Sequence, residues 1–358
     1  MAQNFDLNNY EGLCKLDTTG MIPSLEGLAA QCALAGGDIC RKVDLPGFDA
    51  ISNIVVTGLG GSAIGGDLLR VYAAGRCPVP ITVNRDYGLP HFVGPDTLVF
   101  AVSYSGNTEE TLSAYEEAQV RGASIIAVTT GGKLAELALR DSVPIVKIPS
   151  GLAPRAATGY LFIPTLGILQ RLGLLPDISA EISEMTAFVK VLQKKIGPES
   201  PVEENLSKQL AQKLYNKIPV IWASTGTTEV CAQRWKGQIN ENAKAPAYWN
   251  VFPELNHNEI VGFQFPLEIL NKIHVIILRD ERDHPRVQKR IGITKDMIED
   301  VVDGITEVWA TGNCVLSRLF SLIYTGDYTS FYLAALYGLD PGPVKVIDLL
   351  KNKLAAEK

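Results

Sequence analysis

Three hydroxyl side chains, those of Ser103, Ser105 and Thr108, stand close together around a single glycine. They follow the short apolar run 98–102 and precede a segment with the apolar spacing of a helix. A turn between a buried strand and a helix presents unpaired backbone N–H groups and partial positive charge, so it binds anions readily. A helix cap is the ordinary alternative for Ser or Thr, but capping accounts for one hydroxyl and leaves two. The pattern therefore favours a phosphate-binding turn.

A glycine-rich turn at 58–67 follows another apolar run, and it places Gly61 and Ser62 at the start of a helix. It does not fit a dinucleotide fingerprint, because its glycines run as GxGGSxxGG and no clear acidic residue ends the following strand. Glycines allow a ligand to approach the backbone closely, and Ser62 offers a hydroxyl. The turn 149–159 supplies a cation at Arg155, directly after a further predicted strand. A surface loop arginine is the alternative for Arg155.

The stretch 240–263 carries two groups suited to proton transfer at neutral pH, the carboxylate of Glu241 and the imidazole of His257. We expect Glu241 at the end of a helix and the rest as a long irregular loop, and such loops are usually functional. Taken alone, each residue has a structural alternative, as a helix-end acid or a satisfied loop histidine. Together with a phosphate-binding turn, they indicate proton transfer on a phosphorylated substrate.

These residues need a scaffold that brings the ends of several strands together. Short apolar runs alternate with helical segments, which predicts α/β architecture with doubly wound parallel sheets. The expected strands are 54–57, 79–83, 98–102, 124–128 and 143–148 in the first half, and 218–223, 273–278 and 305–310 in the second. In such sheets the ligand crevice lies beyond the carboxyl ends of the strands, where Ser62, the 103–108 turn and Arg155 converge. The second half repeats this alternation of strands and helices, which indicates an internal repeat. It has charged residues at 279–281 where the first half has the hydroxyls.

The best candidate for a linker is 196–202, which contains Gly and two Pro residues. It divides the chain into a first domain at 1–195, which opens with a helical segment, and a second domain at 203–358. The last segment, 344–354, has apolar residues at helical spacing on one side, so we expect a helix packed on the body of the protein.

Composition excludes several classes of protein. The chain has 358 residues, 46% of them hydrophobic, which is enough for two domains with sizeable cores. A net charge of −6 without a basic tract argues against nucleic-acid binding. The polar N-terminus lacks the features of a signal peptide, and no apolar run reaches the roughly 18 residues of a membrane span. The six cysteines and four histidines show no metal-ligand spacing. We therefore expect a cytoplasmic protein that uses no metal or cofactor and does not bind a membrane.

Five motifs together carry a resemblance to a known family. They are GLGGSAIGGD (58–67), VSYSGNTEET (102–111), PSGLAPRAATGY (149–160), NENAKAPAYWNVFPELNHNEIVGF (240–263) and DPGPVKVIDLLK (340–351). In this order they resemble the bifunctional phosphoglucose/phosphomannose isomerases of the sugar-isomerase (SIS) domain superfamily. The match extends over essentially the whole chain from about residue 45. The resemblance implies two SIS domains, each with a flavodoxin-like parallel sheet.

The resemblance also implies a reaction and roles for residues. The protein would interconvert glucose 6-phosphate and mannose 6-phosphate with fructose 6-phosphate through a cis-enediolate, without a metal. It would be a homodimer in which His257 completes the neighbouring subunit's site. Glu241 would be the base, Arg155 would stabilise the enediolate, and His257 and Lys351 would open the sugar ring; Lys345 and Lys353 are the alternatives to Lys351. The implied phosphate ligands are Gly61, Ser62, Ser103, Ser105 and Thr108.

One departure from the family pattern concerns the mannose substrate. The family has a threonine in the C-terminal segment that is associated with mannose 6-phosphate, whereas no Ser or Thr follows Ser330 here, and Gly342 stands where a small hydroxyl residue is expected. Two rival functions remain open. One is an isomerase for another sugar phosphate. The other is a non-catalytic sugar-phosphate sensor, which would need the hydroxyl turn but not Glu241, Arg155 and His257 together.

Overall fold

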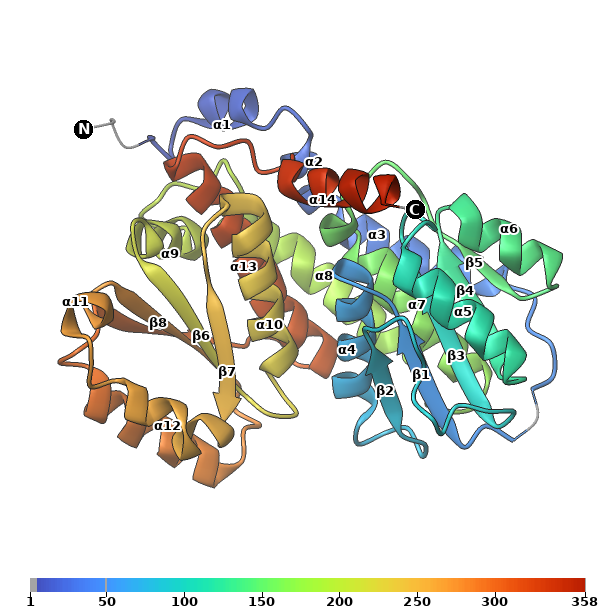
Figure 1. The fold of residues 1–358 in the computed structure, drawn as a ribbon. Coiled ribbons are helices and arrows are strands. Elements are labelled where there is room, and N and C mark those ends of the chain that lie inside the picture. Colours follow the sequence, from blue (N-terminus) through green and yellow to red (C-terminus); the bar gives the residue numbers. More distant parts are fainter. Residues whose placement is uncertain (1–4, 49, 358) are drawn as a thin grey trace. The chain divides into compact units, whose positions relative to one another are not determined.

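A computed structural model describes residues 5–48 and 50–357 (Figure 1). The chain forms two compact units, which we name after their sheets. The first-sheet unit comprises Glu26–Val191 and Thr311–Ser321, and the second-sheet unit comprises the chain up to Leu25, Leu192–Ala310 and the chain from Leu322. The units separate close to the predicted boundary, but each also takes a segment from the other side of it. The domain limits 1–195 and 203–358 therefore stay a prediction.

The first-sheet unit is built on a fully parallel sheet with the strand order β2-β1-β3-β4-β5. Its strands are β1 (Asn53–Thr57), β2 (Ile81–Asn84), β3 (Thr97–Val102), β4 (Ser124–Thr129) and β5 (Ile145–Lys147). The order is that of flavodoxin-like sheets, so the predicted doubly wound architecture is confirmed. All six residues of the central strand β3 are buried, as its uninterrupted apolar run requires.

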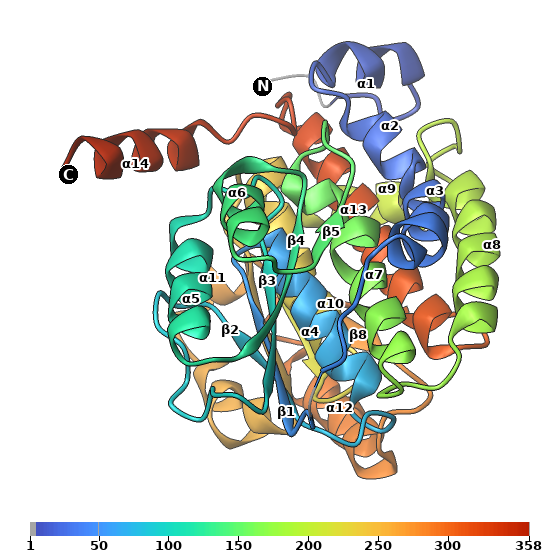
Figure 2. The same cartoon turned by 90° about the vertical axis from the view of Figure 1, so that its right-hand side faces the viewer.

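Helices cover both faces of this sheet (Figure 2). On one face, α5 (Glu109–Val120) and α6 (Gly132–Arg140) pack on alternate strand residues such as Val55 and Val99. On the other face, α4 (Gly61–Ala73) packs closely on Val56. A Cβ atom added at Gly66 would lie 2.8 Å from Val56 Cγ1. The remaining elements of the unit are α3 (Leu28–Leu34), η1 (Ala35–Ile39), η2 (Pro154–Ala156), α7 (Thr158–Arg171) and α8 (Ser179–Ile196).

The second-sheet unit repeats the topology of the first. Its parallel sheet has the order β7-β6-β8-β9, which corresponds to β2-β1-β3-β4, so the predicted internal repeat is confirmed. The strands are β6 (Ile218–Ser224), β7 (Tyr248–Phe252), β8 (Ile273–Arg279) and β9 (Gly304–Trp309). The helices are α1 (Tyr10–Leu16), α2 (Met21–Glu26), α9 (Leu206–Leu214), α10 (Glu229–Gln238), α11 (Leu267–Leu270), α12 (Pro285–Ile298), α13 (Val315–Leu336, from Leu322 onward in this unit) and α14 (Lys345–Ala356).

The prediction of an irregular loop over 240–263 is wrong. The stretch contains η3 (Ile239–Ala243), β7, η4 (Glu254–His257) and η5 (Glu259–Gly262). β7 is the edge strand next to β6, and its first two residues, Tyr248 and Trp249, are exposed. It therefore lacks the continuous apolar run by which the other strands are recognised.

Two further segments differ from expectation. The predicted linker 196–202 is held in place, because Lys208 Nζ donates to the carbonyls of Pro198 (2.8 Å) and Ser200 (2.7 Å). The last helix, α14, does not bury its apolar stripe: Ile347 is 40% exposed, Leu350 58% and Leu354 48%. No helix within the described residues is both long enough and apolar enough to span a membrane.

Candidate active site

The 103–108 turn is organised by a pair of hydroxyls. Ser103 is fully buried directly after β3, and its Oγ lies 2.8 Å from Thr108 Oγ1 and accepts a hydrogen bond from Gly106 N (3.1 Å). Thr108 stands at the N-cap of α5, yet its side chain makes no capping hydrogen bond. Ser105 is exposed and accepts from Asn107 N (3.2 Å). The capping alternative therefore fails for Thr108, whose hydroxyl is paired with that of Ser103.

The glycine-rich turn lies beside the hydroxyl turn. A Cβ at Gly58 would lie 2.8 Å from Val102 O, so this glycine permits the close approach of the two turns. Ser62 is buried in the first turn of α4, and its Oγ accepts a hydrogen bond from Tyr104 N (3.4 Å). These turns follow β1 and β3, the neighbouring strands at which the order of a doubly wound sheet reverses. Ligands of such sheets bind at this switch point.

Arg155 reaches the same place from the turn after β5. A Cβ at Gly61 would lie 2.8 Å from Pro154 O and 3.2 Å from Arg155 N, so only glycine fits where α4 meets η2. The Arg155 side chain is only 4% exposed, so the surface-loop alternative fails for this residue. The structure therefore brings Gly61, Ser62, Ser103, Thr108 and Arg155 to one end of the first sheet.

Sequence reasoning missed the residue that joins these turns, Tyr104. Its hydroxyl donates to Pro149 O (3.1 Å) and accepts from Leu152 N (2.9 Å), which ties the hydroxyl turn to the turn carrying Arg155. Burial raises the pKa of Tyr104, so the phenol stays protonated and can keep donating. A lone aromatic residue after a strand looks like ordinary core, and no spacing pattern marks it.

A further turn, after β4, was also missed. This turn contacts the hydroxyl turn directly. A Cβ atom at Gly106 (φ +72°) would lie 1.8 Å from Gly131 O, and Lys133 N donates to Asn107 Oδ1 (3.0 Å). Thr129 Oγ1 accepts from Gly131 N (3.1 Å). The sequence Thr-Thr-Gly-Gly at 129–132 repeats the hydroxyl-and-glycine signal of the other turns, and that signal was sufficient to find it.

The electrostatics of this end of the first sheet suit a phosphate group. The N-termini of α4 and α5 carry partial positive charge and unpaired N–H groups, and Arg155 adds a full charge from a buried position. We call the five expected phosphate ligands, Gly61, Ser62, Ser103, Ser105 and Thr108, the phosphate cradle; Arg155 lies beside it.

Glu241 lies in the second-sheet unit, on the π-helical turn η3 that continues α10. Its neighbours hold this turn firmly: Asn240 Nδ2 donates to Ala245 O (2.8 Å) and Asn242 Nδ2 to Ser330 Oγ (2.9 Å). One turn earlier, Gln238 Nε2 donates to the buried Asp327 carboxylate (2.9 Å). Glu241 itself is half-buried. Single π-helical turns are frequent at functional sites, because they displace one residue from regular helical packing.

His257 and Lys351 occupy exposed positions in the second-sheet unit. His257 ends η4 and is solvent-accessible, and so is Lys351 on α14. Large apolar side chains near His257 in the chain are exposed as well: Tyr248 is 60% exposed, Val261 64% and Phe265 79%. The phosphate cradle thus belongs to one unit, and Glu241, His257 and Lys351 belong to the other.

The turn Ser224–Thr228 follows β6, which corresponds to β1, and it is filled by the carboxylates of Glu229 and of Asp283, which follows β8. Gly226 N donates to Glu229 Oε2 (3.0 Å), and Thr227 Oγ1 donates to Asp283 Oδ1 (2.5 Å). These carboxylates take the N–H and hydroxyl groups that would otherwise face an external anion. The predicted loss of the phosphate site in the second half therefore has a physical cause.

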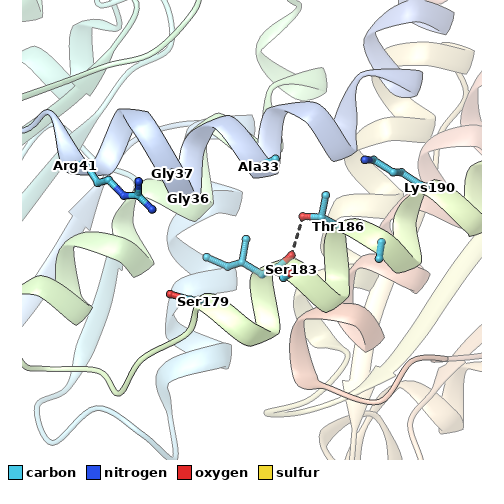
Figure 3. A pocket seen from close by; sticks show the side chains of 10 residues that line it. Ala33, Gly36, Gly37, Arg41, Ser179, Ser183, Thr186 and Lys190 are labelled. Carbon is cyan, nitrogen blue, oxygen red and sulfur yellow. Dashed lines mark hydrogen bonds between the residues drawn. The ribbon is translucent and has the colours of Figure 1, made fainter.

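A separate pocket of about 460 Å³ lies between η1 and α8 in the first-sheet unit (Figure 3). Small and hydroxyl-bearing residues line it, with Arg41 and Lys190 at its edges. The Thr186 hydroxyl is engaged with its own helix through Ile182 O (2.7 Å). None of the predicted site residues lines this pocket. Among the residues that the structure describes, no group of three or more His, Cys, Asp or Glu side chains is arranged to hold a metal ion.

Several known proteins are similar to this chain in sequence and in fold. Residues 203–354 match the bacterial phospho-glucose isomerase C-terminal SIS domain, and residues 51–143 match the SIS domain. A bifunctional phosphoglucose/phosphomannose isomerase of Caldicellulosiruptor bescii is 56% identical over 308 residues, which cover 86% of this chain and 91% of that protein. Its counterpart from Aquifex aeolicus is 40% identical over 305 residues, which cover 84% and 90%. A solved structure of a glucose-6-phosphate isomerase like protein from Thermus thermophilus shares the fold, with a TM-score of 0.60 and 21% identity over 94% of this chain and 97% of that one.

Proposed function

Because the chain belongs to the family of bifunctional phosphoglucose/phosphomannose isomerases, we propose that it interconverts glucose 6-phosphate and mannose 6-phosphate with fructose 6-phosphate. The observation that carries the proposal is the convergence of three separate turns on one end of a parallel sheet, where the phosphate cradle lies beside the buried Arg155. When the phosphate group of a sugar phosphate is bound there, the carbon chain of the sugar remains accessible to other groups of the protein.

The reaction needs one group that takes a proton and returns it to the adjacent carbon. We assign this role to Glu241. Its carboxylate removes the proton from C2 of the open-chain aldose and delivers it to C1, while a proton moves between the oxygens on C2 and C1, so no atom is gained or lost. Arg155 stabilises the negative charge of the cis-enediolate between these two transfers. His257 and Lys351 open the sugar ring by moving protons between its ring oxygen and its anomeric hydroxyl.

We further propose that the protein works in the cytoplasm as a homodimer, with His257 supplied to the neighbouring subunit's site. Exposed apolar side chains in the second-sheet unit support this assembly, because patches of this kind mark interaction surfaces. They occur close to His257 in the chain, at Val261 and Phe265, and along α14, where Val346 is 81% exposed.

The position of Thr19, near the N-terminus, supports activity toward mannose 6-phosphate. Gly342 stands where the family pattern has a hydroxyl residue, and a Cβ there would lie 1.6 Å from Thr19 Oγ1. The hydroxyl of Thr19 therefore occupies the space of the missing side chain. We expect Thr19→Val to lower the ratio of mannose 6-phosphate to glucose 6-phosphate formed from fructose 6-phosphate.

The test is an assay of the purified protein with fructose 6-phosphate and EDTA, in which both aldose phosphates are followed separately. We expect both products from the wild type and a loss of at least about 10³-fold in turnover for Glu241→Gln, because the amide cannot accept the proton. Glu268→Gln, an exposed carboxylate on α11, is the matched control and should keep full activity. Bound substrate without turnover would instead identify a sensor, and turnover of a different sugar phosphate would change the substrate.

A further inference from the structure

The turn that carries Glu241 ends in an unusual backbone conformation at Lys244. This residue caps η3 in the left-handed region, at φ 54° and ψ 25°. Helices commonly end in this conformation, but the residue is then usually Gly or Asn, because a Cβ makes it costly. Such strain persists where the surrounding structure holds the residue in place.

The ammonium group of Lys244 is surrounded by four backbone carbonyl oxygens. Two belong to its own turn, Glu241 O (2.9 Å) and Asn242 O (3.1 Å). Two belong to a segment almost one hundred residues later, Asp340 O (3.1 Å) and Pro341 O (2.9 Å). An ammonium has three N–H groups, so the acceptors outnumber the donors. Lys244 is therefore engaged with the backbone of two segments.

The contacts within the turn have a clear physical basis. The last carbonyls of a helix lack hydrogen-bond donors within the helix and carry partial negative charge. A cation at this end therefore supplies donors to the carbonyls and balances the negative charge. A single side chain thus binds the carbonyl of Glu241 itself and joins it to the segment 340–341.

That segment is itself firmly held. Gly342 N donates to Asp340 Oδ1 (2.9 Å), and the Thr18 hydroxyl donates to the same carboxylate. Only glycine fits at position 342, because a Cβ would overlap with Thr19. The segment leads directly into α14, which carries Lys351.

We propose that Lys244 is a positioning residue for the isomerase reaction: it fixes the backbone of Glu241 against the segment 340–342. This inference rests on the proposed function of Glu241. Proton transfer between adjacent carbons requires the carboxylate to reach both, and a displacement of about 1 Å can cost about 10²-fold in rate. Lys244 keeps the backbone of Glu241 within that tolerance without touching the substrate.

The decisive variant is Lys244→Asn, which accepts the left-handed backbone but has no ammonium. We expect kcat with fructose 6-phosphate to fall at least about ten-fold while KM changes less than about two-fold, since phosphate binding depends on the cradle. Lys244→Arg, which retains a cation with several donors, should recover most of kcat. Lys236→Met on α10 is the matched control and should resemble the wild type.

Two further measurements separate positioning from general stability. In a Glu241→Gln background, Lys244→Asn should cause no additional loss of turnover, because a residue that acts through Glu241 has nothing left to position. Hydrogen exchange of segment 339–354 should be faster in Lys244→Asn than in the wild type. Unchanged kcat, an equal loss in both backgrounds or unchanged exchange would overturn the inference. An inactive wild type would count against the proposed function, and the exchange data would then decide whether Lys244 holds the segment.

Discussion

Ser103, which is fully buried, and Thr108, which is half-buried, form a pair of hydroxyls that organises the turn after β3. Both hydroxyls are within hydrogen-bond distance of each other, and Ser103 also accepts from Gly106 N. The pair therefore arranges the turn as well as offering donors to a ligand. Hydrogen bonds to a charged group contribute more than those between neutral groups.

We predict that Ser103→Ala raises KM for fructose 6-phosphate about ten-fold or more, with a much smaller change in kcat. The lost interaction is with the phosphate, which does not change during the reaction, so its loss weakens ground state and transition state alike. Steady-state kinetics measure both constants. Ser113→Ala, on the following helix α5, is the control and should leave KM unchanged. A fall in kcat at constant KM would contradict the assignment of Ser103 to phosphate binding.

At the scale of elements, a buried ion pair fixes α10 to α13 below the turn that carries Glu241. Arg234 on α10 meets Asp327 on α13 through two hydrogen bonds, of 3.0 Å from Nε and 2.7 Å from Nη2, and both side chains are almost fully buried. Removing one partner of such a pair leaves an uncompensated buried charge. The geometry of α10, and with it η3, depends on this pair.

We expect Asp327→Leu to lower the free energy of unfolding by about 3–5 kcal/mol. Urea denaturation measures the loss. The double variant Arg234→Met with Asp327→Leu should recover part of the stability, because it leaves no buried charge, although Gln238 Nε2 still loses its acceptor. If the double variant recovers no stability, the packing and hydrogen bonds of the two side chains, and not the buried charge, make the pair necessary.

A second element-scale prediction concerns β8 and β9, which His274 joins through Asp303 (3.0 Å) and Thr306 (2.9 Å). Burial lowers the pKa of His274, although Asp303 opposes the shift. The unfolded chain therefore binds a proton more readily than the folded one, so stability falls as the pH drops below the ordinary histidine pKa of about 6.5. Thermal unfolding between pH 7.5 and 5, about one to two units on either side of that value, measures this slope. His274→Gln should reduce it, and an unchanged slope would assign the pH dependence to other groups.

The sequence predicted strands correctly where a short apolar run marks them. Strands such as β3 are covered on both faces and therefore appear as unbroken apolar runs. β7 was missed because an edge strand with exposed Tyr248 and Trp249 has no such run. The segment 196–202 has the composition of a linker, but Lys208, which follows it, binds its carbonyls. Local composition does not reveal such tertiary contacts.

The same distinction applies to the candidate site. Short spacing patterns predicted Ser62 in the glycine-rich turn after β1, and Ser103 and Thr108 in the hydroxyl turn between β3 and α5. Tyr104 and Lys244 act through contacts with distant backbone carbonyls, and their own neighbours in the sequence give no sign of this.

At the scale of the whole molecule, the proposed sharing of His257 between subunits has a testable consequence. We predict that Glu241→Gln and His257→Ala, each inactive alone, recover about a quarter of wild-type activity after unfolding and refolding as a mixture. After random association, half of the dimers contain one chain of each variant. In each mixed dimer, one of the two sites combines an intact Glu241 with an intact His257, so a quarter of all sites are active. Activity after mixing, with sedimentation to confirm the dimer, provides the test. Absence of recovery in mixed dimers would place His257 in its own subunit's site.

The self-filled turn at Ser224–Thr228 has a consequence for ligand stoichiometry. The four strands of the second sheet repeat the order of β2-β1-β3-β4, yet Glu229 and Asp283 there occupy groups of the kind that we propose bind phosphate in the first sheet. A repeated fold would then carry a single ligand. Titration calorimetry with fructose 6-phosphate should therefore saturate at one molecule per chain.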